Sequence, residues 1–500
     1  MTELSLLELR DRLDSGEWTS RRAVEFYLAR IEKHDPQLRS VIETNSDALA
    51  IADALDLERA DGQIRGPLHG IPVLIKENID TADKMQTTAG SLALEGHIAR
   101  RDAFLVEQLR KAGAVILGKT NLSEWANFRS PRSTSGWSSR GGQCRNPYAL
   151  DRSPCGSSSG SGAAVAANFA AAAVGTETDG SVVCPSQTNG IVGLKPTLGL
   201  VSRSGIIPIA HSQDTAGPMT RTVMDAAILL GAMTGFDERD AATGRLKETV
   251  ETDYTRFLDK NGLNGARIGV SRNFIGPDER VKRVFEQAIE VIKGLGAEII
   301  DPANVDNEEK YSKSELEVLL YEFQADVDAY LAEHLNIKLR SMKEIVAYNK
   351  QERARVMPFF GQEYMEQAIK KGPLTQKKYL AALEKDVRLS RKGIDDVLAA
   401  HKLDALIAPT GGPAWTIDLV NGDHHVAGGF STAAAVAGYP HITVPMGYVF
   451  GLPVGLSFFG PAWSDGRMLK FAYAFEQATL VRKPPQFLPT VDLSAPETSW

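Results

Sequence analysis

The chain has 500 residues, of which 43% are hydrophobic and 24% are charged, and its formal net charge at pH 7 is -7. These values are typical of globular proteins and exclude a disordered, collagen-like or coiled-coil chain. Acidic residues outnumber basic ones, whereas a chain that binds nucleic acid neutralises phosphates with many Lys and Arg residues. We therefore expect no nucleic acid among its ligands.

The N-terminal part, about residues 1–60, is expected to be helical, since apolar residues recur at helical spacing from Val24 to Ile31. Its first residues lack the basic segment and continuous apolar core of a signal peptide. The longest run of small apolar residues, 162–175, is about 14 residues long and falls short of the ~20 that a membrane span needs. We expect a cytoplasmic protein that does not contact a membrane, or a secreted or periplasmic one if a signal peptide preceded residue 1.

Short apolar runs alternate with helix-like stretches between about residues 70 and 302. Two of the helix-like stretches are Phe104–Lys111 and Val223–Met233. The expected strands lie near residues 71–75, 114–117, 171–174, 191–194, 267–270 and 297–300. This alternation predicts an α/β fold, with a large mixed β-sheet core flanked by helices on both faces.

A helical excursion is expected at about residues 311–400, which are rich in Lys, Glu, Leu and Tyr and carry no clear strand pattern. Strand patterns return near 403–408, 441–445 and 454–459, followed by a helix near 468–478. The sequence contains no internal repeat and no low-complexity linker. We therefore expect residues 1–500 to form a single domain.

Two short motifs match known patterns but lack the structural context that each pattern needs. Residues 113–120, GAVILGKT, fit the P-loop pattern, yet the four residues between the two glycines, 114–117, are expected to form a buried strand rather than a phosphate-binding loop. Residues 156–160, GSSSG, fit the nucleophile elbow of α/β-hydrolases with Ser158 at its centre. No strand pattern precedes them, and nothing in the sequence marks one of the nine histidines as a partner. Nucleotide binding is set aside, and the elbow remains a weaker alternative.

The three cysteines, Cys144, Cys155 and Cys184, are few and widely spaced. A disulfide framework or a zinc site usually shows closer and more regular spacing. We expect all three to be buried or loop thiols.

A pair of serines is predicted to converge on two tight turns. A Gly- and Ser-rich stretch at 130–162 lacks periodicity, and long ordered loops of this kind are usually functional. It leads into an Ala-rich helix of about 11 residues and a returning strand of five or six, and both elements cover roughly 16 Å. The strand therefore brings Ser181, in the turn that follows it, back close to Ser157.

A lysine is the expected base for these serines, because burial disfavours the ammonium form and lowers its pKa towards neutrality. Lys76 ends the apolar strand near 71–75 and is the first candidate. Lys119 and Lys195 also follow apolar runs and compete for the role. The alternative for Lys76 is a strand-end lysine whose ammonium reaches water.

These segments resemble the amidase signature family, and the resemblance covers nearly the whole chain, from about Leu68 to Gly460. It is carried by GPLHGIPVLIKENID, GKTNLSEWANF, RNPYALDRSPCGSSSGSGAAVAAN and VGTETDGSVVCPSQTNGIVGLKPT, and by the closing segments AGYPHITVPMG and GLPVGLSFFG. The resemblance implies the amidase signature fold and a hydrolase that cleaves amides through an acyl-enzyme. It implies neither a cofactor nor a metal.

The family's catalytic triad falls on Lys76 as base, Ser157 as the bridging serine, whose peptide bond is cis in relatives, and Ser181 as the acylated nucleophile. The resemblance places the oxyanion hole at the backbone N–H groups of Thr178, Asp179, Gly180 and Ser181.

The signature region is most similar to the bacterial peptide amidase branch, which removes the C-terminal carboxamide of peptides. Many members carry Arg two residues after the nucleophile, where this chain has Val183. We therefore expect a small-molecule or peptide amide as substrate, with Arg129 or Arg203 as alternative sources of a positive charge. The alternative function is the glutamine-hydrolysing component of a tRNA-dependent amidotransferase, whose free glutamine substrate carries a carboxylate that an Arg would pair. The sequence indicates no oligomeric state.

Overall fold

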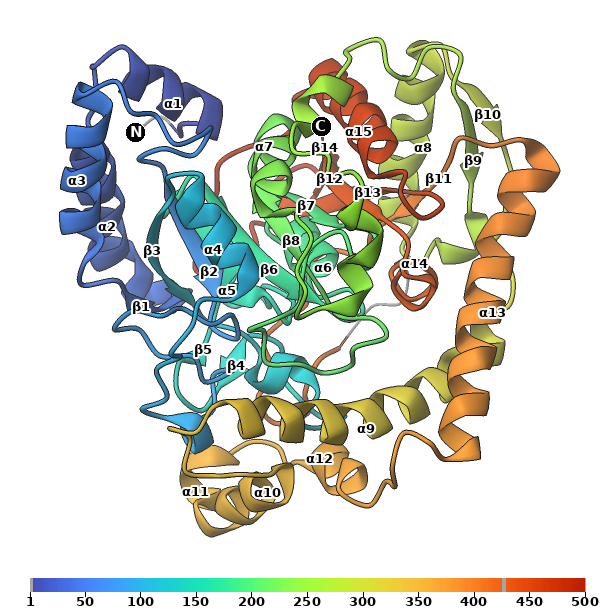
Figure 1. Cartoon of the computed structure of the whole chain (residues 1–500). Helices are drawn as coiled ribbons and strands as arrows, with labels where there is room; N and C mark the ends of the chain where they lie inside the picture. Colours follow the sequence, from blue (N-terminus) through green and yellow to red (C-terminus); the bar gives the residue numbers. More distant parts are fainter. Residues whose placement is uncertain (1–2, 425–428, 500) are drawn as a thin grey trace.

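The computed structural model describes residues 3–424 and 429–499 (Figure 1). Its strands are β1 (Val41–Thr44), β2 (Pro72–Lys76), β3 (Val115–Thr120), β4 (Trp137–Ser138), β5 (Gly142–Gln143), β6 (Ala172–Glu177), β7 (Val192–Lys195), β8 (Thr215–Thr220), β9 (Arg267–Val270), β10 (Glu298–Ile300), β11 (Ala405–Pro409), β12 (His441–Val449), β13 (Leu452–Phe459) and β14 (Thr498–Ser499).

These strands form one mixed sheet of 12 strands and a separate pair, β4–β5. The order in the large sheet is β1-β3-β2-β6-β8-β7-β12-β13-β11-β9-β10, and β14 pairs with β12. Strand β2 runs parallel to β3 and β6, and β9 runs parallel to β10 and β11. The other neighbours are antiparallel. Strands β12 and β13 are buried along their whole length, as expected of central strands covered on both faces.

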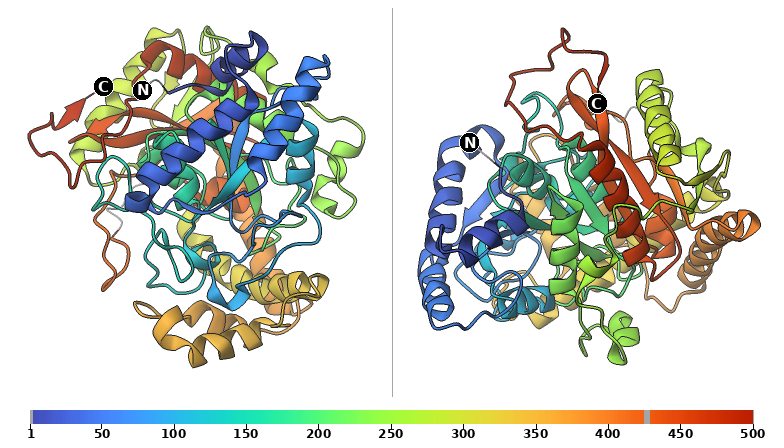
Figure 2. Two further views of the ribbon diagram at one scale, coloured as in Figure 1. Left: turned by 90° about the vertical axis from the view of Figure 1, so that its left-hand side faces the viewer. Right: turned by 90° about the horizontal axis from the view of Figure 1, so that it is seen from above.

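The α-helices are α1 (Leu6–Asp14), α2 (Ser20–Leu38), α3 (Ala48–Ala60), α4 (Phe104–Lys111), α5 (Ser159–Ala166), α6 (Val183–Thr188), α7 (Val223–Met233), α8 (Glu279–Gly294), α9 (Glu308–Glu333), α10 (Met342–Gln351), α11 (Arg353–Val356), α12 (Glu363–Ala368), α13 (Lys377–His401), α14 (Thr432–Ala437) and α15 (Asp465–Thr479). Helices cover both faces of the large sheet (Figures 1 and 2), which confirms the predicted fold class. Among the described residues, no helix is both long enough and apolar enough to cross a membrane.

Helices α9 to α13 occupy the segment that was expected to be a helical excursion. They enter from β10 and return to β11, and the long helices α9 and α13 pack against each other at the lower right of the molecule (Figure 1). The side chain of Leu319 on α9 reaches the cavity described below. The excursion therefore contributes to the walls of the candidate site.

The expected helices 104–111 and 223–233 have the observed bounds of α4 and α7, whereas β1, β8 and the two-residue strands β4, β5 and β14 were missed. The N-terminal region was expected to be wholly helical, but Val41–Thr44 forms β1, an edge strand antiparallel to β3. Strand β8, with the sequence TAGPMT, also went unrecognised. The segment 115–120 of the P-loop match is β3, a fully buried strand, as expected.

Helix α5 differs from its prediction, because it begins within the Gly/Ser motif and spans only 8 residues. All of them are buried. A Cβ atom at Gly160 would lie 2.2 Å from the carbonyl oxygen of Ser40 and 2.5 Å from that of Asn121. Only glycine lets the helix start approach these backbones so closely. The loop that carries Ser157 and Ser158 is therefore held against the backbone just before β1 and just after β3.

Candidate active site

A cavity of about 440 Å³ opens over the loop that joins β6 to α6. Its walls include the turn 178–181, the residues Cys155 and Gly156, and the loop segments 410–413 and 429–431. This cavity contains the turn on which Ser181 was predicted.

Lys76 ends β2 and is completely buried. Its Nζ donates hydrogen bonds to Ser157 Oγ at 2.7 Å, to Thr176 Oγ1 at 2.8 Å and to the carbonyl oxygen of Thr176 at 3.2 Å. Burial lowers the pKa of Lys76 to about 7, although the charges of Asp214 and Glu177 oppose this shift. The lysine does not reach water, and it is poised to exchange a proton with Ser157 near neutral pH.

The competing lysines are buried elsewhere. Lys119 Nζ donates to the carbonyl oxygen of Ile79 at 2.6 Å and to Thr87 Oγ1 at 3.0 Å. Lys195 Nζ donates to the carbonyl oxygen of Pro196 at 3.1 Å. Neither lysine donates to a serine within the described residues, so Lys76 is the lysine that lies at the seryl loop.

The Gly156–Ser157 peptide bond is cis, as the family resemblance implied. The next residue, Ser158, is engaged with the backbone: its Oγ donates to the carbonyl oxygen of Thr176 at 3.0 Å and accepts from the N–H of Thr176 at 3.2 Å. Its own N–H donates to the carbonyl oxygen of Ser181 at 3.2 Å. The bond between Ser158 and Ser181 confirms that the two serine-bearing loops converge. The two bonds between Ser158 Oγ and Thr176 indicate that Ser158 stabilises the backbone and is not an exposed elbow nucleophile.

Ser181 lies on the cavity wall, with 8% of its surface exposed. Gly180, before it, has a φ of +78°, a left-handed conformation that favours glycine. The N–H groups of Thr178, Asp179 and Ser181 have no acceptor among the described residues. The N–H of Gly180 is different, because it donates to Glu177 Oε1 at 2.9 Å. Gly180 is therefore not free to serve as an oxyanion donor in this arrangement, and three of the four expected donors remain.

Glu177 is a site residue that the sequence reasoning missed. Its carboxylate accepts the N–H groups of Gly180 at 2.9 Å, Val182 at 2.8 Å and Val183 at 3.1 Å, and so ties down the backbone on both sides of Ser181. Burial raises its pKa, whereas Lys195 and the backbone donors lower it. The available signal was an acid at the end of a buried strand, four residues before the candidate nucleophile.

The charge of the cavity is set by Asp179, the single ionisable side chain along the part of its wall that the structure describes. Thr432 Oγ1 donates to Asp179 Oδ2 at 2.7 Å. Burial raises the pKa of Asp179 and that of Glu315 on α9. The charge of Asp179 raises the pKa of Glu315 further, whereas hydrogen bonds with Thr432 and Glu315 lower the pKa of Asp179. Asp179 therefore faces the cavity either as a carboxylate or with a proton that it shares with Glu315.

The two arginines considered as partners for a substrate carboxylate are engaged with acids. Arg129 donates to Glu124 at 2.6 Å, and both side chains are buried. Arg203 forms an ion pair with Asp240. Val183, which follows Ser181 by two residues, lies on the cavity wall.

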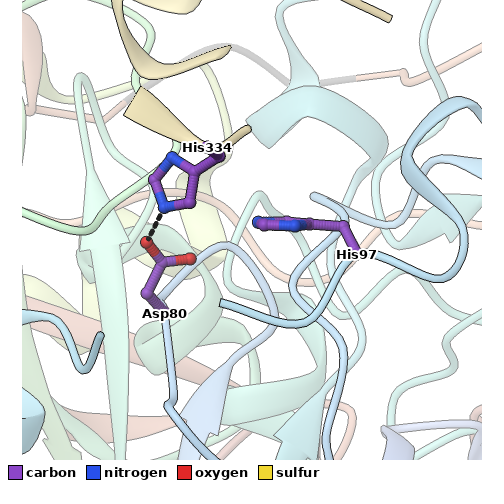
Figure 3. A group of neighbouring side chains, drawn as sticks. All are labelled: Asp80, His97 and His334. Atoms are coloured by element: carbon purple, nitrogen blue, oxygen red, sulfur yellow. Dashed lines mark hydrogen bonds and ion pairs between the residues drawn. The ribbon is translucent and has the colours of Figure 1, made fainter. Parts of the chain in front are cut away.

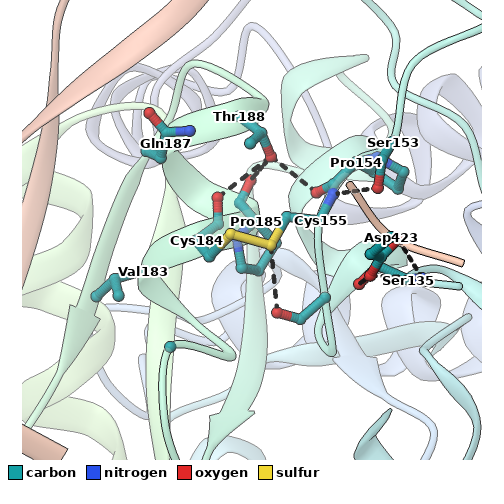
Figure 4. The surroundings of a disulfide bond; sticks show 12 residues. Ser135, Ser153, Pro154, Cys155, Val183, Cys184, Pro185, Gln187, Thr188 and Asp423 are labelled. Carbon is teal, nitrogen blue, oxygen red and sulfur yellow. Dashed lines mark hydrogen bonds between the residues drawn. A yellow bond between two sulfur atoms is a disulfide. The ribbon is translucent and has the colours of Figure 1, made fainter. Parts of the chain in front are cut away.

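The expectation of three free thiols is wrong, because Cys155 and Cys184 form a disulfide (Figure 4). Because the two cysteines are 29 residues apart in the sequence, their spacing did not indicate the pairing. In the structure, helix α5 and strand β6 lie between them and bring the two Cα atoms to 6.0 Å. Cys144 is a buried free thiol, as expected.

Within residues 3–424 and 429–499, two groups of side chains have the composition of a metal site, and neither contains a residue of the cavity wall. Figure 3 shows the first, in which potential ligand atoms of Asp80, His97 and His334 lie within 4.8 Å of one another. These groups are already paired: His334 lies 3.0 Å from Asp80, and the hydroxyl of Tyr330 donates to Asp80 at 2.7 Å and lies 3.2 Å from His97. The second group is His211, Glu322 and Asp326. The first network ties α9 to the loop after β2.

Comparisons with known proteins identify the family of the chain. A family model described as Amidase matches residues 22–469. The native peptide amidase from Stenotrophomonas maltophilia is 50% identical, with a TM-score of 0.93 and coverage of 97% of this chain and 99% of that chain. A probable amidase of Arabidopsis thaliana is 41% identical over 97% of this chain and 92% of its own length. A glutamyl-tRNA(Gln) amidotransferase component of Halorhodospira halophila is 36% identical over 96% of this chain and 98% of its own length. With these matches across almost its whole length, the chain belongs to the amidase signature family and is an amide hydrolase.

Proposed function

We propose that this amidase hydrolyses neutral carboxamides, and in particular the C-terminal carboxamide of peptides, to a carboxylate and ammonia. The observation that carries the proposal is the buried contact of 2.7 Å between Lys76 Nζ and Ser157 Oγ, next to a cavity that exposes Ser181. The 50% identity to a peptide amidase supports the choice of substrate class.

In the proposed mechanism, Ser181 is the nucleophile, Ser157 relays protons and neutral Lys76 is the base. Ser181 Oγ attacks the amide carbonyl carbon while its proton passes to Ser157 Oγ and the proton of Ser157 passes to Lys76 Nζ. The proton returns through Ser157 to the amide nitrogen, because an amine leaves far more readily when it is protonated. Ammonia departs and leaves an acyl group on Ser181. Water, activated by the same relay, then releases the carboxylate.

The tetrahedral oxyanion would accept hydrogen bonds from the N–H groups of Thr178, Asp179 and Ser181. Donors of this kind are preorganised, and one of them is worth roughly 3–4 kcal/mol in other acyl-transfer enzymes. The bonds from Gly180, Val182 and Val183 to Glu177 hold the turn in place. Gly180 thus stabilises the geometry rather than the oxyanion.

Substrate selection would follow from charge. A carboxylate next to the scissile amide would meet Asp179 and the apolar side chain of Val183, and burying an unpaired carboxylate costs several kcal/mol. A neutral carboxamide carries no such penalty. The proposal therefore favours peptide amides over free glutamine, the substrate of the amidotransferase alternative.

The test is a comparison of two substrates with the purified chain alone, with released ammonia as the readout. A short peptide carboxamide should give a kcat/KM at least 100-fold above that of free glutamine. Comparable values for the two substrates, or release of ammonia only from glutamine, would overturn the proposal in favour of the amidotransferase alternative. Hydrolysis of other neutral amides but not of peptide amides would keep the mechanism and reject the substrate class.

A further inference from the structure

The Cys155–Cys184 disulfide closes a loop that contains both serines of the candidate site. The closed loop contains Ser157, Ser181 and the lysine-binding residue Thr176. It also contains Glu177, which ties down the nucleophile turn. Of the proposed triad, only Lys76 lies outside the loop.

Each end of the bridge is attached close to one catalytic serine. Cys155 precedes Ser157 by two residues, and its carbonyl oxygen accepts from Ser159 Oγ at 2.6 Å. Cys184 follows Ser181 by three residues, and its N–H donates to the carbonyl oxygen of Gly180 at 2.8 Å. A shift of either sulfur would therefore pass directly into the backbone that carries a serine.

A few hydrogen bonds join the two segments beside the bridge. Thr188 Oγ1 and Asn189 Nδ2 donate to the carbonyl oxygen of Pro154 at 2.8 and 2.9 Å, before Cys155 in the chain (Figure 4). On the Ser157 side, the N–H of Ser158 donates to the carbonyl oxygen of Ser181 at 3.2 Å. These bonds would keep the two segments together without the disulfide, but the loop that carries Ser157 would lose its covalent link to the turn that carries Ser181.

Both cysteines line the substrate cavity, and they differ in exposure. Cys155 is buried, with 3% of its surface exposed, whereas Cys184 is partly exposed. A small reductant can thus reach the bridge from the cavity, where a bound substrate would stand in its way.

We propose that the Cys155–Cys184 disulfide positions Ser157 against Ser181 and makes the amidase redox-sensitive, because a dithiol that enters the substrate cavity opens the bridge and slows acylation. The proposal rests on the proposed function, since it assigns the two serines to the reaction. It treats the cysteines as positioning residues that take no part in the chemistry.

The reaction with a dithiol balances without any other reactant. One thiolate of dithiothreitol attacks Cys184 Sγ, forms a mixed disulfide and releases Cys155 as a thiolate. The second thiol of the same reagent then attacks the mixed disulfide, releases Cys184 and closes to oxidised dithiothreitol. Two electrons and two protons, which together make two hydrogen atoms, pass to the protein, so that its mass rises by about 2 Da.

The experiment uses a Cys144→Ser protein, so that the bridge is the only source of thiols. Cys144 is buried and does not line the cavity, and this substitution is expected to leave activity unchanged. The protein is incubated with dithiothreitol, and the mass, the far-UV circular dichroism and the release of ammonia from a peptide carboxamide are followed together. Reduction should lower kcat on the order of tenfold, with a smaller change in KM and an unchanged circular dichroism spectrum, because a displacement of about 1 Å in a catalytic group can cost up to 100-fold.

A saturating concentration of the peptide carboxamide should slow the reduction several-fold, whereas the corresponding peptide with a free carboxylate should not. Complete reduction without any loss of kcat would overturn the positioning role. Reduction at the same rate with and without substrate would overturn the cavity route.

A second variant keeps the test independent of the reductant. Cys155→Ser/Cys184→Ser should reproduce the low kcat of the reduced protein and be indifferent to dithiothreitol. A double variant as active as the oxidised protein would contradict the proposal. If the oxidised protein released no ammonia from any amide, the proposed function would fail instead. The rate at which a fluorophosphonate labels Ser181, with and without the bridge, would then decide the positioning role.

Discussion

The pH dependence of acylation gives a quantitative test of Lys76 as the base. Its buried amine has a pKa of about 7, and only the neutral form can accept the proton of Ser157. The neutral fraction is then about 9% at pH 6 and about 91% at pH 8. We therefore expect kcat/KM for a neutral peptide amide to rise about tenfold between these values and to level off above pH 8.

An ordinary lysine would behave differently. With a pKa near 10.4, its neutral fraction would be about 0.4% at pH 8, and kcat/KM would climb roughly 70-fold between pH 8 and pH 10. The assay is the initial rate of ammonia release at low substrate concentration in buffers of constant ionic strength from pH 5.5 to 10. A kcat/KM that still rises steeply above pH 9 would show that the base has the pKa of an ordinary lysine.

Two substitutions assign the titration to Lys76. The charge of Asp214 raises the pKa of Lys76, so Asp214→Asn should move the acidic limb to lower pH. Glu308 is the matched control, because burial raises its pKa to about 7 as well. Glu308→Gln should leave the limb in place. A limb that disappears in Glu308→Gln would show that the carboxyl group, rather than the lysine, had been titrated.

Three further substitutions test the roles of individual side chains. Ser157→Ala should lower kcat by a factor of 100 or more, because the proton relay is lost. Ser158→Ala should change kcat less than tenfold and mainly lower the melting temperature. Equal effects of the two substitutions on kcat would contradict the assignment of the relay to Ser157. Glu177→Gln keeps the shape of the side chain but replaces one carboxylate oxygen with an NH₂ group, which cannot accept a hydrogen bond from the backbone N–H groups. Each N–H left without an acceptor costs about 1–3 kcal/mol. We therefore expect Glu177→Gln to lower both the melting temperature and kcat. A lower melting temperature with an unchanged kcat would show that Glu177 stabilises the fold without positioning the nucleophile.

The fold was predictable where local pattern and burial agree. Helices α4 and α7 have the bounds that their apolar spacing indicated. Strand β8 was not predictable, because Gly217 and Pro218 within TAGPMT disfavour a strand and only its place between β6 and β7 makes it one. Strand β1, with the sequence VIET, has 4 residues and lies at the edge of the sheet, and so it is too short to show a strand pattern next to the helices on either side.

The site was predictable to the extent that chemistry marks single residues. Lys76 ends an apolar strand, and Ser157 and Ser181 lie in Gly-containing turns at the two ends of a short helix–strand unit. The disulfide left no local trace, because its cysteines are 29 residues apart and meet only through tertiary structure. Glu177 was missed for a related reason: its function is to bind three backbone N–H groups, and no side-chain motif records that arrangement.

The most direct test of the central claim is to identify the residue that is acylated. The protein is treated with a fluorophosphonate, digested, and mapped by mass spectrometry, with Ser181→Ala as the control. We expect one label per chain, on Ser181, and no label in the variant. A label on Ser158 would instead indicate a nucleophile elbow in the GSSSG motif and contradict the assignment of Ser181 as the nucleophile.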